Sequence, residues 1–232
     1  FDFDANTRKL ERKAKSVEKG FGKLKTAIAG AVSFELLRRT ALLADRMELL
    51  DVRIRNATKT QQQFNRAQSE LIRISNKTGT ALENNVRLFE AFTIAGQELG
   101  ATNDQVLLLT ENINKLGIIG GSTTEALGNA TLQLGQALAG GIVRAEEFNS
   151  VVENTPLIAK AIADGLGVSV GVLRKMVLEG RLLSQDVFNS ILGQTDDISQ
   201  RFSTFPVTID KAFTGLTTNI ALALKEADSM LG

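Results

Sequence analysis

The sequence contains no cysteine, histidine, tryptophan or tyrosine, so phenylalanine is its only aromatic residue. Without cysteine the chain forms no disulfide and offers no thiolate, and its composition does not indicate whether it works in an oxidising or a reducing compartment. Without histidine it lacks the commonest general base and metal ligand of proteins. We therefore expect neither an enzyme, nor a metal site, nor a bound cofactor.

Net charge and long hydrophobic runs are also missing. The 27 basic residues nearly balance the 26 acidic ones, so nothing draws the whole chain to nucleic acid or to an anionic membrane. No apolar run approaches the ~18 residues of a transmembrane helix. The chain begins Phe-Asp-Phe-Asp, without a methionine and without the basic start of a signal peptide. We read it as a fragment of a longer protein with no membrane segment in this stretch.

Apolar residues in residues 1–76 recur at alternating steps of four and three, as in a coiled coil. The first such seam runs from Leu10 to Ala31. Its start is basic, because residues 1–25 hold eight Lys or Arg and only four Asp or Glu. Two interpretations stay open for this segment. It is a coiled-coil or partner-binding helix, or it is an amphipathic helix folded back on its own domain.

A second seam begins at Leu36, out of register with the first. Neither glycine nor proline occurs from Ser33 to Asn76, which predicts one helix of about forty residues, ~60 Å long. A small domain cannot cover a seam of that length, so we expect this helix to project and to associate with copies of the chain. The candidate self-association residues, three of them near the C-terminal end, are Leu36, Leu43, Met47, Leu50, Ile54, Phe64, Leu71, Phe213, Leu216 and Ile220.

Glycine sets apart a compact region at residues 77–204. Fourteen of the twenty glycines lie between Gly96 and Gly193, a density that suits turns between short helices. Period-two alternation is not sustained there, so we predict almost no strand. After Pro206 the four-three spacing returns, and residues 205–232 are predicted to begin a further long helix. The expected fold class is all-α, a compact bundle of short helices flanked by long coiled-coil-like helices.

Helix starts in the compact region carry recognisable caps. Capping boxes, in which Ser or Thr precedes Glu or Gln by three residues, are predicted at Thr80, Thr102 and Ser122. Thr155 followed by Pro156 is typical of an N-cap with proline at the first helical position. Phe148 and Leu173 fall on apolar faces of consecutive short helices, and we expect both in the core.

One segment has a pattern that also occurs in DNA-binding proteins. Residues 157–178 read as a helix, a glycine turn and a serine-capped helix, which resembles a helix-turn-helix. The second helix offers only Arg174 and Lys175 to nucleic acid, among apolar neighbours. We favour a packed helical corner. The alternative is a DNA-binding module with a dimerising helix, and we expect no specific binding to duplex DNA.

The ordered features of residues 117–192 carry a family resemblance. They are Gln133-Leu134-x-Gln136-Ala137-Leu138, Gly141, Glu147-Phe148-Asn149-Ser150, Pro156, Ala161-Ile162-Ala163, Leu166-Gly167-Val168-Ser169, Leu173-Arg174 and Gly180. In this order they resemble the N-terminal domain of phage tail tape measure proteins. The likeness is weaker from about Thr60 to the end. Phe148 is a departure, since the family more often has leucine there.

The resemblance implies a structural protein of the virion tail that is present in the host cytoplasm during assembly. Such a protein occupies the lumen of the growing tail tube, and its extended length limits how many rings polymerise. The implied partners are copies of the chain, as a trimer or a multiple of it, together with tail tube, tail tip or assembly chaperone proteins. The opposing enzymatic interpretation, a tail-associated hydrolase, lacks the usual acid–base pair.

Overall fold

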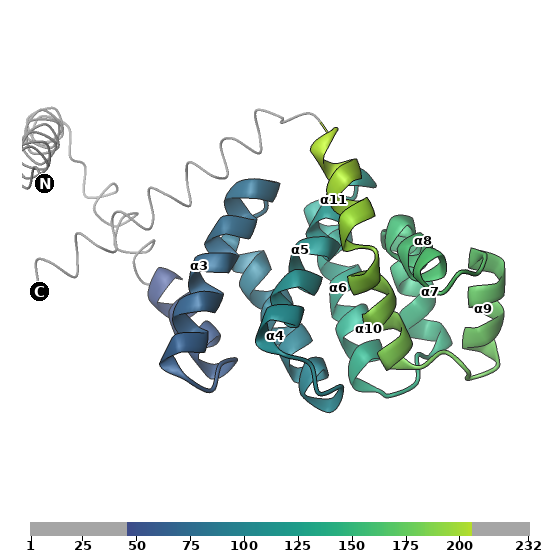
Figure 1. Ribbon diagram of the computed structural model, residues 1–232, viewed down its shortest axis with the longest axis horizontal. Helices are drawn as coiled ribbons and strands as arrows, with labels where there is room; N and C mark the ends of the chain where they lie inside the picture. Colours follow the sequence, from purple (N-terminus) through teal and green to yellow (C-terminus); the bar gives the residue numbers. More distant parts are fainter. Residues whose placement is uncertain (1–45, 206–232) are drawn as a thin grey trace, which may run out of the picture. The chain divides into compact units, whose positions relative to one another are not determined.

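A computed structural model describes residues 46–205, and this part of the chain folds into helices joined by short turns (Figure 1). A helical segment at 46–56 comes first. The helices that follow are α3 (Gln61–Thr78), α4 (Leu82–Glu98), α5 (Asn103–Ile119), α6 (Thr124–Ala139), α7 (Ala145–Asn154), α8 (Pro156–Gly165), α9 (Val170–Leu178), α10 (Ser184–Gly193) and α11 (Thr195–Ser203). Within residues 46–205 the predicted all-α class is confirmed.

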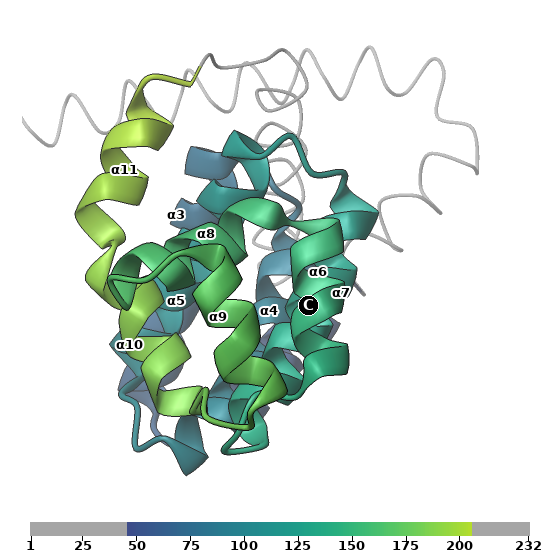
Figure 2. The same ribbon diagram turned by 90° about the vertical axis from the view of Figure 1, so that its right-hand side faces the viewer.

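Helix α5 is the central element of the domain. It contacts α3, α4, α6, α8, α10 and α11, and eleven of its seventeen residues are buried. Figure 2 shows α10 and α11 following one another along one side, with α6 and α7 on the other. The large apolar side chains Phe89, Phe92 and Phe188 are buried in this core. Six helices therefore pack around α5.

The only extended pairing within residues 46–205 is an antiparallel bridge between Ile142 and Leu183. Val143 donates its backbone N–H to Leu182 O at 2.9 Å, and Ser184 donates to Gly141 O at 3.0 Å. The bridge ties the turn after α6 to the turn before α10. It agrees with the prediction of almost no strand in the compact region.

The prediction of one unbroken helix from Ser33 to Asn76 is wrong within the described residues. The chain leaves the helix at 57–60, where threonine hydroxyls compete for backbone groups. Thr58 Oγ1 donates to Ile54 O at 2.9 Å, and Thr60 Oγ1 accepts from Gln63 N at 3.2 Å as the N-cap of α3. A turn thus forms without glycine or proline.

The second seam is covered by the chain itself wherever the structure describes it. Helix α3 packs against α4 and α5. Segment 46–56 lies against both α3 and α4, because Gln68 donates to Asp51 at 2.7 Å and Arg53 pairs with Glu90 at 3.6 Å. The buried seam residues are Met47, Leu50, Ile54, Phe64 and Leu71. These five side chains are core residues of one chain and are not an exposed seam between chains.

Two consequences follow for the predicted boundaries. Helix α3 runs through the boundary predicted at residue 76 and ends at Gly79, whose φ of 71° permits the left-handed C-cap. The compact region therefore begins earlier than predicted. The other candidate self-association residues, Leu36, Leu43, Phe213, Leu216 and Ile220, lie outside the described residues.

The predicted caps were partly correct. Thr102 and Gln105 form a capping box at α5, and Pro156 is the first residue of α8. At α6 the cap is Thr123, because its hydroxyl accepts from Ala126 N while Ser122 bonds to Asn154 O. At α4 the N-cap is Ala81, since the Thr80 hydroxyl turns inward to Asn85. Local pattern located the starts of these helices to within one residue.

Candidate functional site: the polar cluster of helix α5

Five polar side chains of α5 are buried, and we call four of them, Glu111, Asn112, Asn114 and Lys115, the α5 polar cluster. The fifth, Thr110, donates its hydroxyl to Val106 O of the same helix. Lys115 is 2% exposed and Glu111 5% exposed, while both asparagines are fully buried. Lysine and glutamate are rarely buried to this degree unless they are paired. The cluster is buried because helices surround α5 on all sides.

Glu111 is the acidic centre of the cluster. Its carboxylate oxygens lie 2.5 Å from the guanidinium Nη2 of Arg73, 2.9 Å from Lys77 Nζ and 2.8 Å from Lys115 Nζ. Burial favours the neutral acid, but hydrogen bonds from Arg73, Lys115 and Lys77 outweigh it and lower the pKa of Glu111 to about 2. Glu111 is therefore a carboxylate at neutral pH and joins α3 to α5.

Lys115 continues the cluster toward α11. Its ammonium donates to Ser199 Oγ at 2.9 Å, in addition to its ion pair with Glu111. Burial lowers the pKa of Lys115, whereas the Glu111 carboxylate opposes that change. The amine is thus desolvated but has both an anionic and a hydroxyl partner.

The two asparagines reach further helices. Asn112 Nδ2 donates to Thr195 Oγ1 at 2.8 Å and to Ile191 O at 3.3 Å, which connects α5 with α10 and α11. Asn114 Nδ2 donates to Asn85 Oδ1 of α4 at 2.9 Å. Because an unpaired buried polar group is costly, these bonds favour one arrangement of the helices over its alternatives.

A serine beside a buried lysine also occurs in some hydrolases, where a neutral lysine takes the proton of the serine nucleophile. At the Lys115–Ser199 contact, burial lowers the pKa of Lys115, but the Glu111 carboxylate 2.8 Å from Lys115 Nζ acts in the opposite direction and favours the charged ammonium over the neutral base. In the described part of the chain, no group of three or more Asp or Glu residues could hold a metal ion. The geometry suits a structural role for the cluster.

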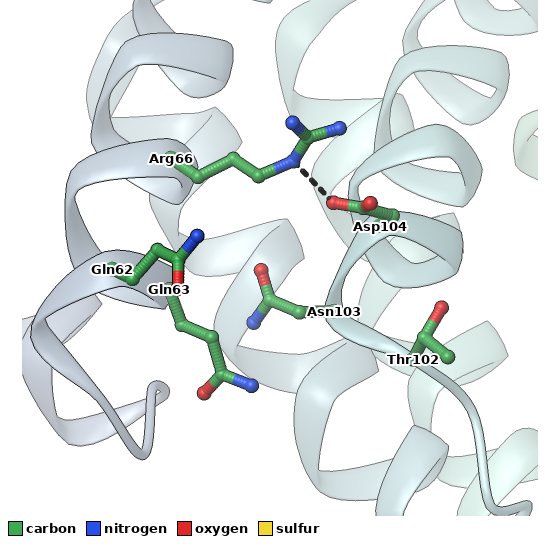
Figure 3. A pocket seen from close by; sticks show the side chains of 6 residues that line it. All are labelled: Gln62, Gln63, Arg66, Thr102, Asn103 and Asp104. Atoms are coloured by element: carbon green, nitrogen blue, oxygen red, sulfur yellow. Dashed lines mark hydrogen bonds and ion pairs between the residues drawn. The ribbon is translucent and has the colours of Figure 1, made fainter.

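A separate surface pocket lies where α3 and α5 begin (Figure 3). It has a volume of about 240 Å³. Arg66 of α3 and Asp104 of α5 form an ion pair of 2.5 Å across it, and both side chains are well exposed. The residues that line the pocket are Gln62, Gln63, Arg66, Thr102, Asn103 and Asp104. Neither Lys115 nor Ser199 belongs to this lining, so the pocket gives no access to that contact.

The nucleic-acid candidates of α9 are exposed. Arg174 and Lys175 both face solvent, and Lys175 lies 3.8 Å from Glu179. Val172 is 47% exposed and Leu178 76% exposed on the same short helix, whereas Leu173 is buried.

No single helix of residues 46–205 is long and apolar enough to cross a membrane. Helices α8 and α9 pass that test together by length and composition alone, as a pair bent by 89°.

The α5 polar cluster was missed by sequence reasoning. Glu111 and Lys115 are four residues apart, a spacing that normally indicates a solvent-exposed pair on a helix surface. The one available signal was polar residues on every side of a helix whose apolar positions were otherwise regular. That signal does not show that the polar side chains are buried, because burial depends on the six helices around α5.

The helices of residues 46–205 enclose a polar centre, and this architecture is that of an all-α domain. A family model described as Tape measure protein matches residues 38–229, a span that includes every helix from α3 to α11. The match covers well over half of the chain, and the chain belongs to the tape measure protein family. Tape measure proteins are structural proteins of the phage tail, so the resemblance drawn from residues 117–192 is confirmed. No match was found among curated proteins or among solved structures.

Proposed function

We propose that this chain belongs to the protein that sets tail length in its phage, and that it occupies the tail tube lumen during assembly. The family match across residues 38–229 carries this proposal. An α-helix rises 1.5 Å per residue, so a largely helical chain converts residue number into a defined length. In this proposal the domain at 46–205 is the compact, non-extended part, because its helices fold back on one another.

The proposed partners are copies of the same chain, as a trimer or a multiple of it, and tail tube, tail tip or assembly chaperone proteins. The five seam residues buried within one chain do not contribute to self-association in this proposal. The remaining candidates are Leu36, Leu43, Phe213, Leu216 and Ile220. The host cytoplasm during assembly, and the virion tail afterwards, are the proposed locations.

Protease protection in intact particles tests the lumen location. We expect the chain to co-purify with tails and to resist protease while the tube is closed. The wall of a closed tube would shield the chain from protease, so cleavage should begin only after ejection is triggered. Tube protein digested in parallel serves as the accessibility control. Cleavage of the chain in closed tails, at the rate seen for free protein, would place it outside the tube.

A second candidate function, duplex DNA binding, is favoured only by the 89° bend between α8 and α9 and by exposed Arg174 and Lys175. A recognition helix needs several side chains for base edges and phosphates. Helix α9 presents instead the apolar Val172 and Leu178. We therefore propose that the α8–α9 corner has a packing role.

A further inference from the structure

Helix α11 is attached to the domain by very few buried groups. Ile198 is its only buried residue, whereas α10 buries five residues and α5 eleven. Helix α11 contacts mainly α5 and, less extensively, α10. Figure 1 shows it following α10. Local stability follows the number of buried apolar contacts, so α11 belongs to the least stable part of the described fold.

Polar contacts add to the attachment. Asn112 Nδ2 donates to Thr195 Oγ1 at 2.8 Å, and Lys115 Nζ donates to Ser199 Oγ at 2.9 Å. Both donors belong to the α5 polar cluster, and both acceptors are hydroxyls that water can replace. These bonds fix the position of α11 but add little net stability, because water offers equivalent partners on opening.

The surface beneath α11 tolerates opening better than an apolar core would. Lifting α11 gives water access to Lys115, whose charge is disfavoured by burial in the closed domain. The ion pair between Lys115 and Glu111 lies within α5 and does not need α11. Lifting α10 would instead expose Phe188 and Ile191, which are large apolar core residues.

The joint between the two helices consists of one residue. Gln194 separates α10 from α11 with φ −90° and ψ 8°, in the bridge region outside the α-helical range, and its side chain makes no capping bond. A change of the backbone angles at this one residue can swing α11 away from α5 without unfolding either helix.

We propose that α11 is a latch that opens at Gln194 while the rest of the domain stays folded. Opening uncovers the Asn112 and Lys115 side chains of α5. The latch thus sets whether residues 195–203 are bound to α5 or released from it. This device goes beyond the proposed tail function and does not depend on it.

Native-state hydrogen exchange on the full chain tests the latch. The amides of α11 are expected to exchange at least ~100-fold faster than those of α10 and α5, with almost no dependence on denaturant, because local opening exposes little new surface. The amides of α5 should exchange only through global unfolding. Equal rates and equal denaturant dependence for α11, α10 and α5 would overturn the proposal.

Two hydroxyl variants sharpen the test. Ser199→Ala removes the acceptor of the Lys115 bond and should speed exchange within α11 by about 2- to 10-fold, the effect of one typical hydrogen bond, while α10 is unchanged. Ser203→Ala is the matched control, because this exposed hydroxyl bonds only within α11, to Gln200 O. If Ser199→Ala speeds α10 as much as α11, the two helices open together and no latch exists.

Because the chain has no cysteine, a single introduced thiol gives an independent measurement. Ile198→Cys and Ile191→Cys place a thiol at two positions that are both 0% exposed, one on α11 and one on α10. The α11 thiol should react with a thiol reagent at least ~50-fold faster, since its exposure needs only the local opening. Similar rates would contradict the latch.

Discussion

The charge of Glu111 is predicted to be a large single contribution to the stability of the domain. Its pKa is lowered from 4.5 to about 2 by Arg73, Lys115 and Lys77, against the opposing effect of burial. One pKa unit corresponds to about 1.4 kcal/mol, so the lowering is worth about 3 kcal/mol at neutral pH. Glu111→Gln, which also leaves Lys115 buried without its anion, should cost about 3–5 kcal/mol.

The sign of the pH dependence follows from the same numbers. A folded-state pKa below the unfolded value stabilises the protein above about pH 4.5, and this stabilisation is lost as the pH falls toward 2. Urea unfolding of the full chain at several pH values measures it. The difference between the unmodified chain and Glu111→Gln should be largest at pH 7 and shrink progressively between pH 4.5 and 2.

The matched control is Glu83→Gln. Glu83 pairs with Arg87 at 2.7 Å on the exposed face of α4, with the same four-residue spacing that separates Glu111 from Lys115. Exposed pairs contribute only about 0.3–0.5 kcal/mol, so this variant should be nearly neutral. A cost below about 1 kcal/mol for Glu111→Gln at pH 7, or an undiminished cost at pH 2, would refute the account of the cluster.

Three further predictions concern the core, a helix contact and the α9 surface. Phe148→Ala and Leu173→Ala, at residues 3% and 0% exposed, should each destabilise by about 2–5 kcal/mol in denaturant unfolding, and an unchanged midpoint would show that the side chain is not packed. Gly165→Ala should cost at least about 1–3 kcal/mol, because its Cβ would come within 2.7 Å of Ser190 backbone; wild-type stability would contradict that packing. The chain should show no sequence preference between random and genomic duplexes, and a hundredfold preference that survives high salt and depends on Arg174 and Lys175 would contradict a packing role for α9.

Local patterns predicted much of the fold, because several helix ends are determined by neighbouring residues. Thr102 caps α5 through Gln105, Ser169 caps α9 through Val172 N, and Gly180 adopts the left-handed conformation after α9. Each of these features depends on residues no more than four positions apart. The sequence therefore shows them without knowledge of the tertiary structure.

Tertiary contacts decided the features that were predicted wrongly. The seam through Phe64 and Leu71 has the spacing of a coiled coil, but the same spacing suits a helix packed in its own domain. The turn at Thr58 and Thr60 decides between them, and Thr60 with Gln63 has the capping pattern that was recognised at Thr102. The lack of glycine and proline does not prevent a turn here, because the threonine hydroxyls replace backbone partners, and the predicted helix is therefore too long.

Burial of Glu111 and Lys115 could not have been predicted from the sequence. Their spacing is the same as that of the exposed Arg87–Glu83 and Lys160–Asp164 pairs. The difference is that α3, α10 and α11 pack over the Glu111–Lys115 pair, whereas the other two pairs face solvent. The spacing of two residues along one helix does not show whether other helices bury them.

The central claim, that the parent protein sets tail length, is tested most directly by electron microscopy of tails from phages with altered tape measure genes. In-frame helical insertions in the tape measure gene outside the compact domain at 46–205 should lengthen the tail in proportion, by about 1.5 Å per added residue, in steps of whole tube rings. Matched insertions of the same size in the exposed turn at Gly140, inside the compact domain, should leave the length unchanged in assembled tails. Tails of constant length across the first series would contradict the account.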